Sequence, residues 1–148
     1  MLIGDKVQWS RTADVVVVGF GAAGAVAAIT AHDSGAEVLI LEKQSAQNHI
    51  TTSSMSAGIF ICPNDVPASI RYMTHISEAE EGLSWADKDM ISTWAEYTAQ
   101  NKEWVESRGG RIELSRRGGE HKVPGSESID AYVYKGMGRG LMRFINRQ

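Results

Sequence analysis

Three glycines and one glutamate have the spacing of a nucleotide-binding site. Gly19, Gly21 and Gly24 form the pattern Gly-x-Gly-x-x-Gly, and Glu42 lies 18 positions after Gly24. In this pattern the first glycine permits a tight strand-to-helix turn, the second lets a pyrophosphate approach the backbone, and the third lets the helix pack close to the strands. The N–H groups at the start of the helix then face the phosphates. The spacing therefore predicts a turn that holds a dinucleotide.

Glu42 supplies the second part of this prediction. A carboxylate at the end of the second strand can accept hydrogen bonds from both ribose hydroxyls of an adenosine. The same charge repels a 2′-phosphate, which disfavours a phosphorylated nicotinamide cofactor. The alternative is a glycine-rich turn of some other α/β protein, in which Glu42 is only a solvated strand end.

The elements predicted around these residues are those expected of a dinucleotide-binding site. Residues 14–18 (DVVVV) predict a strand buried on both faces, because the run is β-branched without polar alternation. Residues 22–33 predict a helix of small residues, and Ser34-Gly35 predicts its end. Residues 37–41 (EVLIL) predict a second strand. Residues 14–43 are thus expected to form one βαβ unit with a parallel sheet, within an α/β fold.

The rest of the chain predicts a helical and β-hairpin excursion from this Rossmann-like core. The expected elements are a polar segment at 44–58, helices at 66–77 and 87–107, short strands at 111–114 and 129–134, and a helix that opens at Gly140. Because only two parallel strands are evident, we expect residues 1–148 to be the N-terminal part of a longer, incomplete domain. The alternative is a compact small domain that uses the hairpin as extra strands.

Composition excludes several classes of protein. The chain has 148 residues and a net charge of −3, which argues against a general nucleic-acid binder. A single cysteine, Cys62, excludes a disulfide scaffold, and we expect it to be a buried small residue rather than a redox centre. No stretch resembles an integral membrane segment or a cleaved leader, so the expected location is cytoplasmic.

Three segments resemble one flavoprotein superfamily. Residues 14–43 (DVVVVGFGAAGAVAAITAHDSGAEVLILEK) resemble the N-terminal FAD-binding segment of flavoproteins with two dinucleotide folds. Residues 51–58 (TTSSMSAG) resemble the (S/T)xxSxG segment that follows in the fumarate reductase and succinate dehydrogenase flavoproteins, a superfamily that includes 3-ketosteroid dehydrogenases. Residues 134–141 (YKGMGRGL) resemble the glycine-containing entry to the next helix in the same group.

The resemblance implies a set of cofactor-binding residues. The FAD pyrophosphate would be wrapped by Gly19, Gly21, Ala23 and Gly24. Glu42 would hold the adenosine ribose, with Lys43 beside it. Hydroxyl and backbone contacts near the pyrophosphate and the flavin would come from Thr52, Ser53, Ser56, Ala57 and Gly58. Taken alone, the last five residues favour a solvated loop with turn chemistry over a binding site, and their position after Glu42 reverses that order.

The sequence departs from the family at one place. Family members often carry a Gly-Gly pair before the Ser/Thr segment, where this chain has Ile50-Thr51. Some respiratory relatives attach FAD covalently through a histidine just ahead of the threonine, at the place of Thr51, whereas His49 lies two residues earlier. Non-covalent FAD is therefore expected.

The resemblance also implies an activity. We expect an FAD-dependent oxidoreductase in which hydride passes between flavin N5 and a C–C or C=C bond of a small dicarboxylate or a 3-ketosteroid. No residue of this chain is identified as catalytic, the electron partner is undefined, and the chain alone is expected to bind FAD weakly and not to turn over. The alternatives are an NAD-dependent dehydrogenase and a non-catalytic nucleotide-binding module.

Other polar and aromatic residues have simpler explanations. The four histidines lack metal-ligand spacing, so no metal site is expected. Packing against a helix face is expected for Trp85, Trp94 and Trp104. Solvation is expected for Arg116, Arg117, Arg139, Arg143 and Arg147.

Overall fold

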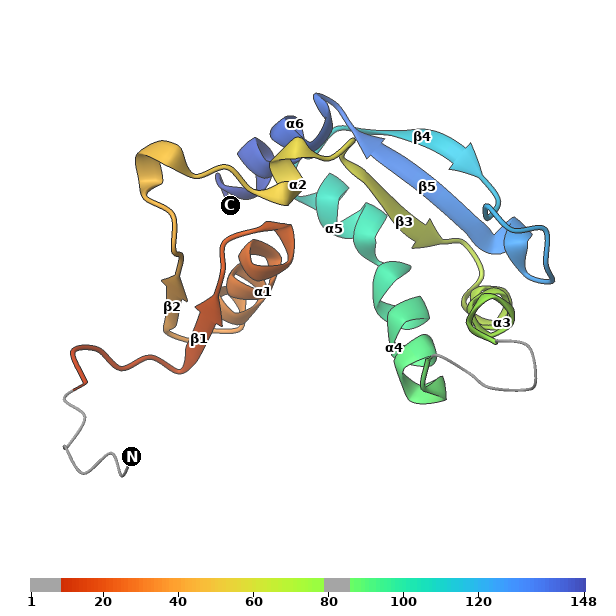
Figure 1. Cartoon of the computed structure of the whole chain (residues 1–148), viewed down its shortest axis with the longest axis horizontal. Coiled ribbons are helices and arrows are strands. Elements are labelled where there is room, and N and C mark those ends of the chain that lie inside the picture. Colours follow the sequence, from red (N-terminus) through yellow and green to blue (C-terminus); the bar gives the residue numbers. More distant parts are fainter. Residues whose placement is uncertain (1–8, 79–85) are drawn as a thin grey trace. The chain divides into compact units, whose positions relative to one another are not determined.

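The computed structural model describes residues 9–78 and 86–148 (Figure 1). The chain divides into two compact units, residues 1–51 and residues 52–148, and each is considered by itself. Trp85 lies outside the described residues, so its expected packing on a helix is not addressed.

The first unit is a βαβ unit. Strand β1 (Val15–Val18) is followed by helix α1 (Ala22–Asp33), strand β2 (Val38–Leu41) and the short 3-10 helix η1 (Ala46–Asn48). The two strands run parallel in a register that pairs Val15 with Val38 and Val18 with Leu41, and α1 packs against both of them. The predicted strand, helix, strand order of residues 14–43 is confirmed.

Helix α1 ends as the sequence predicts. Gly35 adopts a positive φ of 88° after Ser34, a conformation that favours glycine. Its N–H donates to the His32 carbonyl at 2.8 Å, and the Ala36 N–H donates to the Ala31 carbonyl at 3.1 Å. These two bonds satisfy carbonyls that the last turn of a helix leaves open, so the chain turns sharply into β2.

Strand β1 is less covered than its composition predicts. Val16 is 52% exposed and Val18 is 82% exposed, whereas Val15 and Val17 are half-buried. The expectation that both faces are buried is therefore wrong for this chain. A β-branched run indicates a strand, but the described residues do not bury both of its faces.

The second unit is built on an antiparallel sheet. Its strands β3 (Ile59–Pro63), β4 (Ile112–Arg117) and β5 (Ile129–Tyr134) are ordered β3-β5-β4. The predicted pair of later strands is confirmed as β4 and β5. Strand β3 was not predicted, because IFICP is a short apolar run directly after a polar loop. Pro63 closes this edge strand, where a residue without an N–H is tolerated.

Among the described residues, the second unit also contains five helices and a 3-10 turn. They are α2 (Thr52–Met55), α3 (Val66–Ser77), α4 (Lys88–Thr98), α5 (Asn101–Ser107), η3 (Ser126–Ser128) and α6 (Met137–Ile145). Helix α3 has the predicted bounds, and its N-terminus is capped by Asp65, whose carboxylate accepts from the Ala68 N–H at 2.9 Å. Helices α4 and α5 both pack against β3 (Figure 1).

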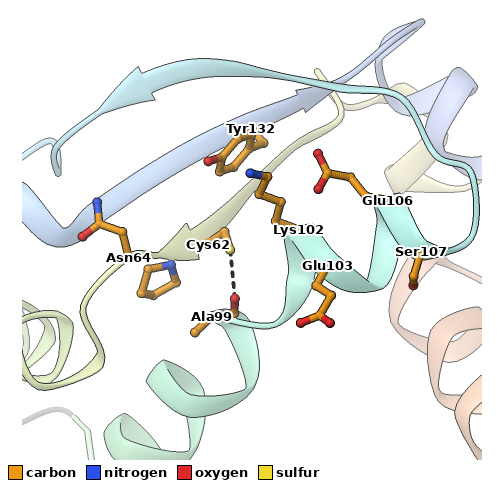
Figure 2. Close-up of a pocket in the computed structure, with 9 residues that line it drawn as sticks. Cys62, Asn64, Ala99, Lys102, Glu103, Glu106, Ser107 and Tyr132 are labelled. Atoms are coloured by element: carbon orange, nitrogen blue, oxygen red, sulfur yellow. Dashed lines mark hydrogen bonds between the residues drawn. The ribbon is translucent and has the colours of Figure 1, made fainter.

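The helix predicted at 87–107 is divided in two by contacts with β3. The Cys62 thiol donates to the Ala99 carbonyl at 3.1 Å (Figure 2). The Asn101 amide donates to the Ile61 carbonyl at 2.9 Å. These bonds hold Ala99 and Asn101 on the strand at the point where α4 ends and α5 begins. Cys62 is buried, as predicted.

The last helix begins earlier than predicted. Helix α6 starts at Met137 rather than at Gly140, directly after Gly136, whose φ is 93°. The core of the second unit includes Ile129, Ala131, Ile91, Ala95, Val105, Met142 and Ile145. Within the described part of the chain, none of the helices combines the length and apolar character that a membrane span requires.

Candidate functional site

The glycine turn lies between β1 and α1. Gly19 follows the last residue of β1, has a φ of 97° and donates its N–H to the Leu41 carbonyl at 2.7 Å. Gly21 then stands at the N-cap of α1 with extended backbone. The positive φ at Gly19 and the bond to β2 explain how the chain reverses within three residues.

Gly24 allows the helix to approach the strand end. A Cβ atom at Gly24 would collide with the carbonyl oxygen of Gly19 and would lie 3.2 Å from Cγ1 of Val17. No other residue type fits this position without displacing the backbone of the turn. Ala25 and Ala28 are buried on the same helix. The close packing that the spacing predicts for Gly24 is therefore present.

The first turn of α1 carries no negative side chain of its own. Gly21 provides no side-chain cap, and the first turn contains no acidic residue. Ala23 lies in that turn. The first N–H groups of a helix carry about half a positive charge, so this end can accept a phosphate group. A pyrophosphate fits this donor set.

Glu42 is fixed beside the glycine turn. One carboxylate oxygen, Oε2, accepts from the Phe20 N–H at 2.8 Å, and the other, Oε1, accepts from the Gln44 N–H at 2.9 Å. The hydrogen bonds from Gln44 and Phe20 hold the pKa of this carboxyl below its usual value, and the charge of His49 adds to the effect. Glu42 is therefore a preorganised, ionised acceptor next to the turn. Lys43 follows it directly.

His49 is a neighbour of Glu42 that the sequence analysis did not assign to the site. Its ring stacks on Phe20 with 5.4 Å between centroids, and its Nε2 lies 3.7 Å from Oε2 of Glu42, beyond hydrogen-bond distance. The His49 side chain is only 15% exposed. His49 is the only titratable residue between Lys43 and the Ser/Thr segment, and this is the signal by which it could have been found.

The loop that carries His49 is anchored by a side chain. The Gln44 amide makes two hydrogen bonds with the backbone of Ile50: its Nε2 donates to the carbonyl at 3.1 Å and its Oε1 accepts from the N–H at 3.0 Å. These bonds close the loop around η1 and keep His49 against Phe20. Phe20 and Gln44 therefore support the site, although neither has a type that suggests chemistry.

The predicted Ser/Thr segment lies in the second unit and is held by α6. Thr52 and Ser53 belong to α2, and Ser56, Ala57 and Gly58 follow it. The Ser56 hydroxyl donates to the Ser53 carbonyl at 2.8 Å and accepts from the Gly58 N–H at 3.1 Å. The Ser56 carbonyl accepts from the Gly138 N–H at 3.1 Å. The structure thus uses Ser56 to shape the segment itself.

Two glycines make this contact possible. Gly58 has a φ of 68°, and a Cβ there would collide with the backbone of Met137. A Cβ at Gly138 would collide with the Ser53 carbonyl and would lie 2.6 Å from the Ser56 carbonyl oxygen. The structure therefore groups the predicted site residues as two sets, Gly19 to Lys43 in the first unit and Thr52 to Gly58 in the second.

Comparisons with known proteins find a matching family and several relatives. The family described as FAD binding domain matches residues 14–135. The chain is 32% identical over 144 residues to a 3-oxo-5-alpha-steroid 4-dehydrogenase of Comamonas testosteroni, covering 86% of this chain and 26% of the relative. It is 28% identical over 148 residues to an NADH:fumarate oxidoreductase of Klebsiella pneumoniae, covering 90% of this chain and 16% of the relative.

Solved structures show the same fold. A 3-ketosteroid-delta4-(5alpha)-dehydrogenase of Rhodococcus jostii, in complex with 4-androstene-3,17-dione, matches with a TM-score of 0.71 and 20% identity. The match covers 95% of this chain and 36% of that one. The chain spans about a quarter of the length of the Comamonas relative. The α/β fold and FAD as the cofactor are thereby shown, and the chain belongs to the FAD binding domain family.

Proposed function

We propose that this chain forms the N-terminal, adenosine- and pyrophosphate-binding part of the FAD domain of an oxidoreductase. The observation that best supports this proposal is the position of the Glu42 carboxylate. It accepts from the N–H groups of Phe20 and Gln44 at 2.8 and 2.9 Å, beside the turn that precedes α1. An acid and a helix N-terminus in this arrangement suit the two ends of an adenosine diphosphate group.

Each part of the first set has a role in the proposal. Gly21, Ala23 and Gly24 offer backbone N–H groups and space to the pyrophosphate, while Gly19 sets the turn. The lone pairs of Glu42 that the backbone leaves free accept from the ribose hydroxyls. Lys43 lies at the rim of this site and contributes less.

The second set lies toward the flavin in this proposal. Thr52, Ser53 and Ala57 supply hydroxyl and backbone contacts there. Ser56 and Gly58, whose N–H donates to the Ser56 hydroxyl, act chiefly by shaping the segment. Thr51 stands where some family members carry a covalently attached histidine, so we propose non-covalent FAD.

The chemistry of the whole enzyme is part of the proposal. Bound FAD supplies hydride transfer at N5, and the protein orients the cofactor and excludes competing reactions. The names of the relatives, a steroid dehydrogenase and a fumarate oxidoreductase, support a 3-ketosteroid or a small dicarboxylate as substrate. We assign no catalytic acid or base to the described residues.

A ligand series tests this proposal. The chain, labelled with nitrogen-15, is titrated with FAD, FMN and NAD, and amide shifts are followed by NMR. We expect weak FAD binding that moves the amides of Gly19, Gly21, Ala23 and Gly24. FMN lacks the adenosine, so equal affinity for FMN would overturn the assignment. Tighter binding of NAD than of FAD would favour the nicotinamide alternative.

Two variants test the role of the acid. Glu42→Ala should weaken FAD binding roughly tenfold, because a charged hydrogen-bond acceptor is lost. Lys43→Ala is the matched control, one residue along the chain, and should change the affinity much less. Equal losses in the two variants would contradict the ribose role of Glu42. Amide spectra of both variants show whether the fold is retained.

A further inference from the structure

A hollow in the second unit is lined mainly by cationic side chains. It has a volume of about 510 Å³, and its walls include Arg108, Arg111, Lys135, Arg143, Arg147 and Tyr134. These residues come from the end of α5, the approach to β4, the end of β5, helix α6 and the turn that follows α6. None of them belongs to the glycine turn or to the Ser/Thr segment.

The charge of this hollow is one-sided. It carries five cationic side chains and no carboxylate side chain among the residues that line it, in a protein of net charge −3. Among the described residues, Arg111, Lys135, Arg143 and Arg147 form no ion pair with an Asp or Glu side chain. Arg116 on β4 shows the contrast, because its guanidinium contacts Glu120 at 2.8 Å.

Another hollow of the second unit has no comparable excess of positive side chains. This hollow of about 560 Å³ combines Lys102 with Glu103 and Glu106, and the Lys102 ammonium lies 5.7 Å from the centre of the Tyr132 ring (Figure 2). Its charges are mixed and offer no excess to an anion. The cationic hollow is therefore distinct in charge from its neighbour.

Helix ends account for only part of the cationic cluster. Arg108 caps α5, and Arg143 lies in the last turn of α6, where cations favour the negative end of a helix. Two such ends contribute about −0.5 each, which is less than the combined charge of Arg111, Lys135, Arg143 and Arg147. Arg111 and Lys135 lie beside strands and have no such role. Arg143 lies on the last turn of α6, and Arg147 lies in the turn just after the helix, which ends at Ile145.

The cations stand on a fixed base. Arg108 lies 4.4 Å from the centre of the Trp104 ring, Trp104 meets the edge of Phe144, and Phe144 stacks on Tyr134 at 5.2 Å. The Lys135 N–H donates to the Arg111 carbonyl at 2.9 Å, which joins the two strand ends. The backbone positions of the cluster are therefore set before any ligand arrives.

We propose that this hollow binds a small anion that carries two or more linked phosphate groups. Guanidinium forks match phosphate oxygens with paired hydrogen bonds, and four of the five cations are arginines. A diphosphate brings enough negative charge to offset the excess, which a single carboxylate does not. Inorganic pyrophosphate and a nucleoside diphosphate share this chemistry.

The test compares matched pairs of variants of the full chain by titration calorimetry at low salt. Pyrophosphate should bind the parent chain, and Arg143→Gln with Arg147→Gln should weaken binding at least roughly tenfold. Arg116→Gln with Arg117→Gln removes the same charge from β4, outside the hollow, and should weaken binding less than about twofold. Equal losses in both pairs would overturn the proposal.

Two further ligands identify the class of anion. ADP binding more tightly than pyrophosphate, with the same loss in the Arg143 and Arg147 pair, would indicate a nucleotide, whereas equal binding would indicate the diphosphate alone. Citrate binding as tightly as pyrophosphate, or no binding of any phosphate ligand, would overturn the proposal. Lys135→Gln provides a third, single variant, and far-ultraviolet circular dichroism verifies that each variant is folded.

Discussion

Two segments of this chain have nearly the same local design and serve different partners. In each, a strand is followed within two residues by a glycine of positive φ, Gly19 at 97° or Gly136 at 93°, and a helix begins within three residues of that glycine. In each, a later glycine, Gly24 or Gly140, lies against a backbone carbonyl of the turn. Both turns therefore need a glycine at a position where a Cβ atom would collide with a backbone carbonyl.

The difference lies in what occupies the start of each helix. The α6 end is taken by protein, because the Gly138 N–H donates to the Ser56 carbonyl at 3.1 Å. The α1 end stands beside the Glu42 carboxylate, which accepts from the Phe20 N–H at 2.8 Å. A glycine pattern thus specifies a close backbone approach, and the neighbouring acid is what indicates a nucleotide at α1.

The largest effect is expected at the start of α6, where the Gly138 N–H donates to the Ser56 carbonyl. Gly138→Ala should lower the free energy of unfolding by about 3 kcal/mol, because the new Cβ collides with the carbonyls of Ser53 and Ser56. Helix propensity alone predicts a gain of about 1 kcal/mol, so the sign decides between the two effects. Urea denaturation of the full chain measures the change.

A control separates this collision from the general cost of replacing glycine. Gly109→Ala places a Cβ in open space at a φ of 78°, so only backbone strain of about 1–2 kcal/mol is expected. A Gly138→Ala variant that is as stable as the parent would show that α2 and α6 are not held together by this contact.

The second-largest effect is expected at the glycine turn that precedes α1. Gly24→Ala should lower the free energy of unfolding by about 2 kcal/mol, because the Cβ collides with the Gly19 carbonyl. It should also abolish the FAD-dependent shifts of the turn, whereas Gly138→Ala should leave those shifts in the molecules that remain folded. Gly35→Ala, with a φ of 88° and open space, is the control that alters stability without affecting FAD binding.

The first unit was largely predictable because its determinants are local. The β1 to β2 order, the end of α1 at Gly35 and the place of Glu42 follow from β-branched runs and from glycines at fixed spacing. Burial was not predictable in the same way, since Val18 is exposed although its type suggests a core. Whether a face is covered depends on segments that the run itself does not encode.

The second unit was predictable in its elements and less so in their boundaries. The break between α4 and α5 depends on bonds from Cys62 and Asn101 across about 40 residues of sequence, which periodicity does not report. The contact of the Ser/Thr segment with α6 is equally non-local. His49 was missed because the contact that holds its ring, stacking on Phe20, joins residues 29 positions apart in the sequence.

The smallest expected effect is on the pH dependence of unfolding, and it concerns two carboxylates whose pKa values are lowered by different interactions. Hydrogen bonds from backbone N–H groups lower the pKa of Glu42, whereas the side chain of Arg116 lowers that of Glu120. In both cases the stabilisation is present above the ordinary pKa of 4.5 and is lost as the pH falls through the lowered value. Glu42→Gln and Glu120→Gln should therefore both reduce the acid sensitivity of unfolding.

Salt should separate the two contributions. The pair of Arg116 and Glu120 is exposed, so high salt screens it and the effect of Glu120→Gln should shrink. The backbone donors of Glu42 are fixed at 2.8 and 2.9 Å, so the effect of Glu42→Gln should persist. Urea denaturation across the acid range, at low and at high salt, measures both. Equal salt sensitivity would mean that Glu42 is held by charge rather than by the turn, and the contrast between the two glycine segments would then lose its electrostatic basis.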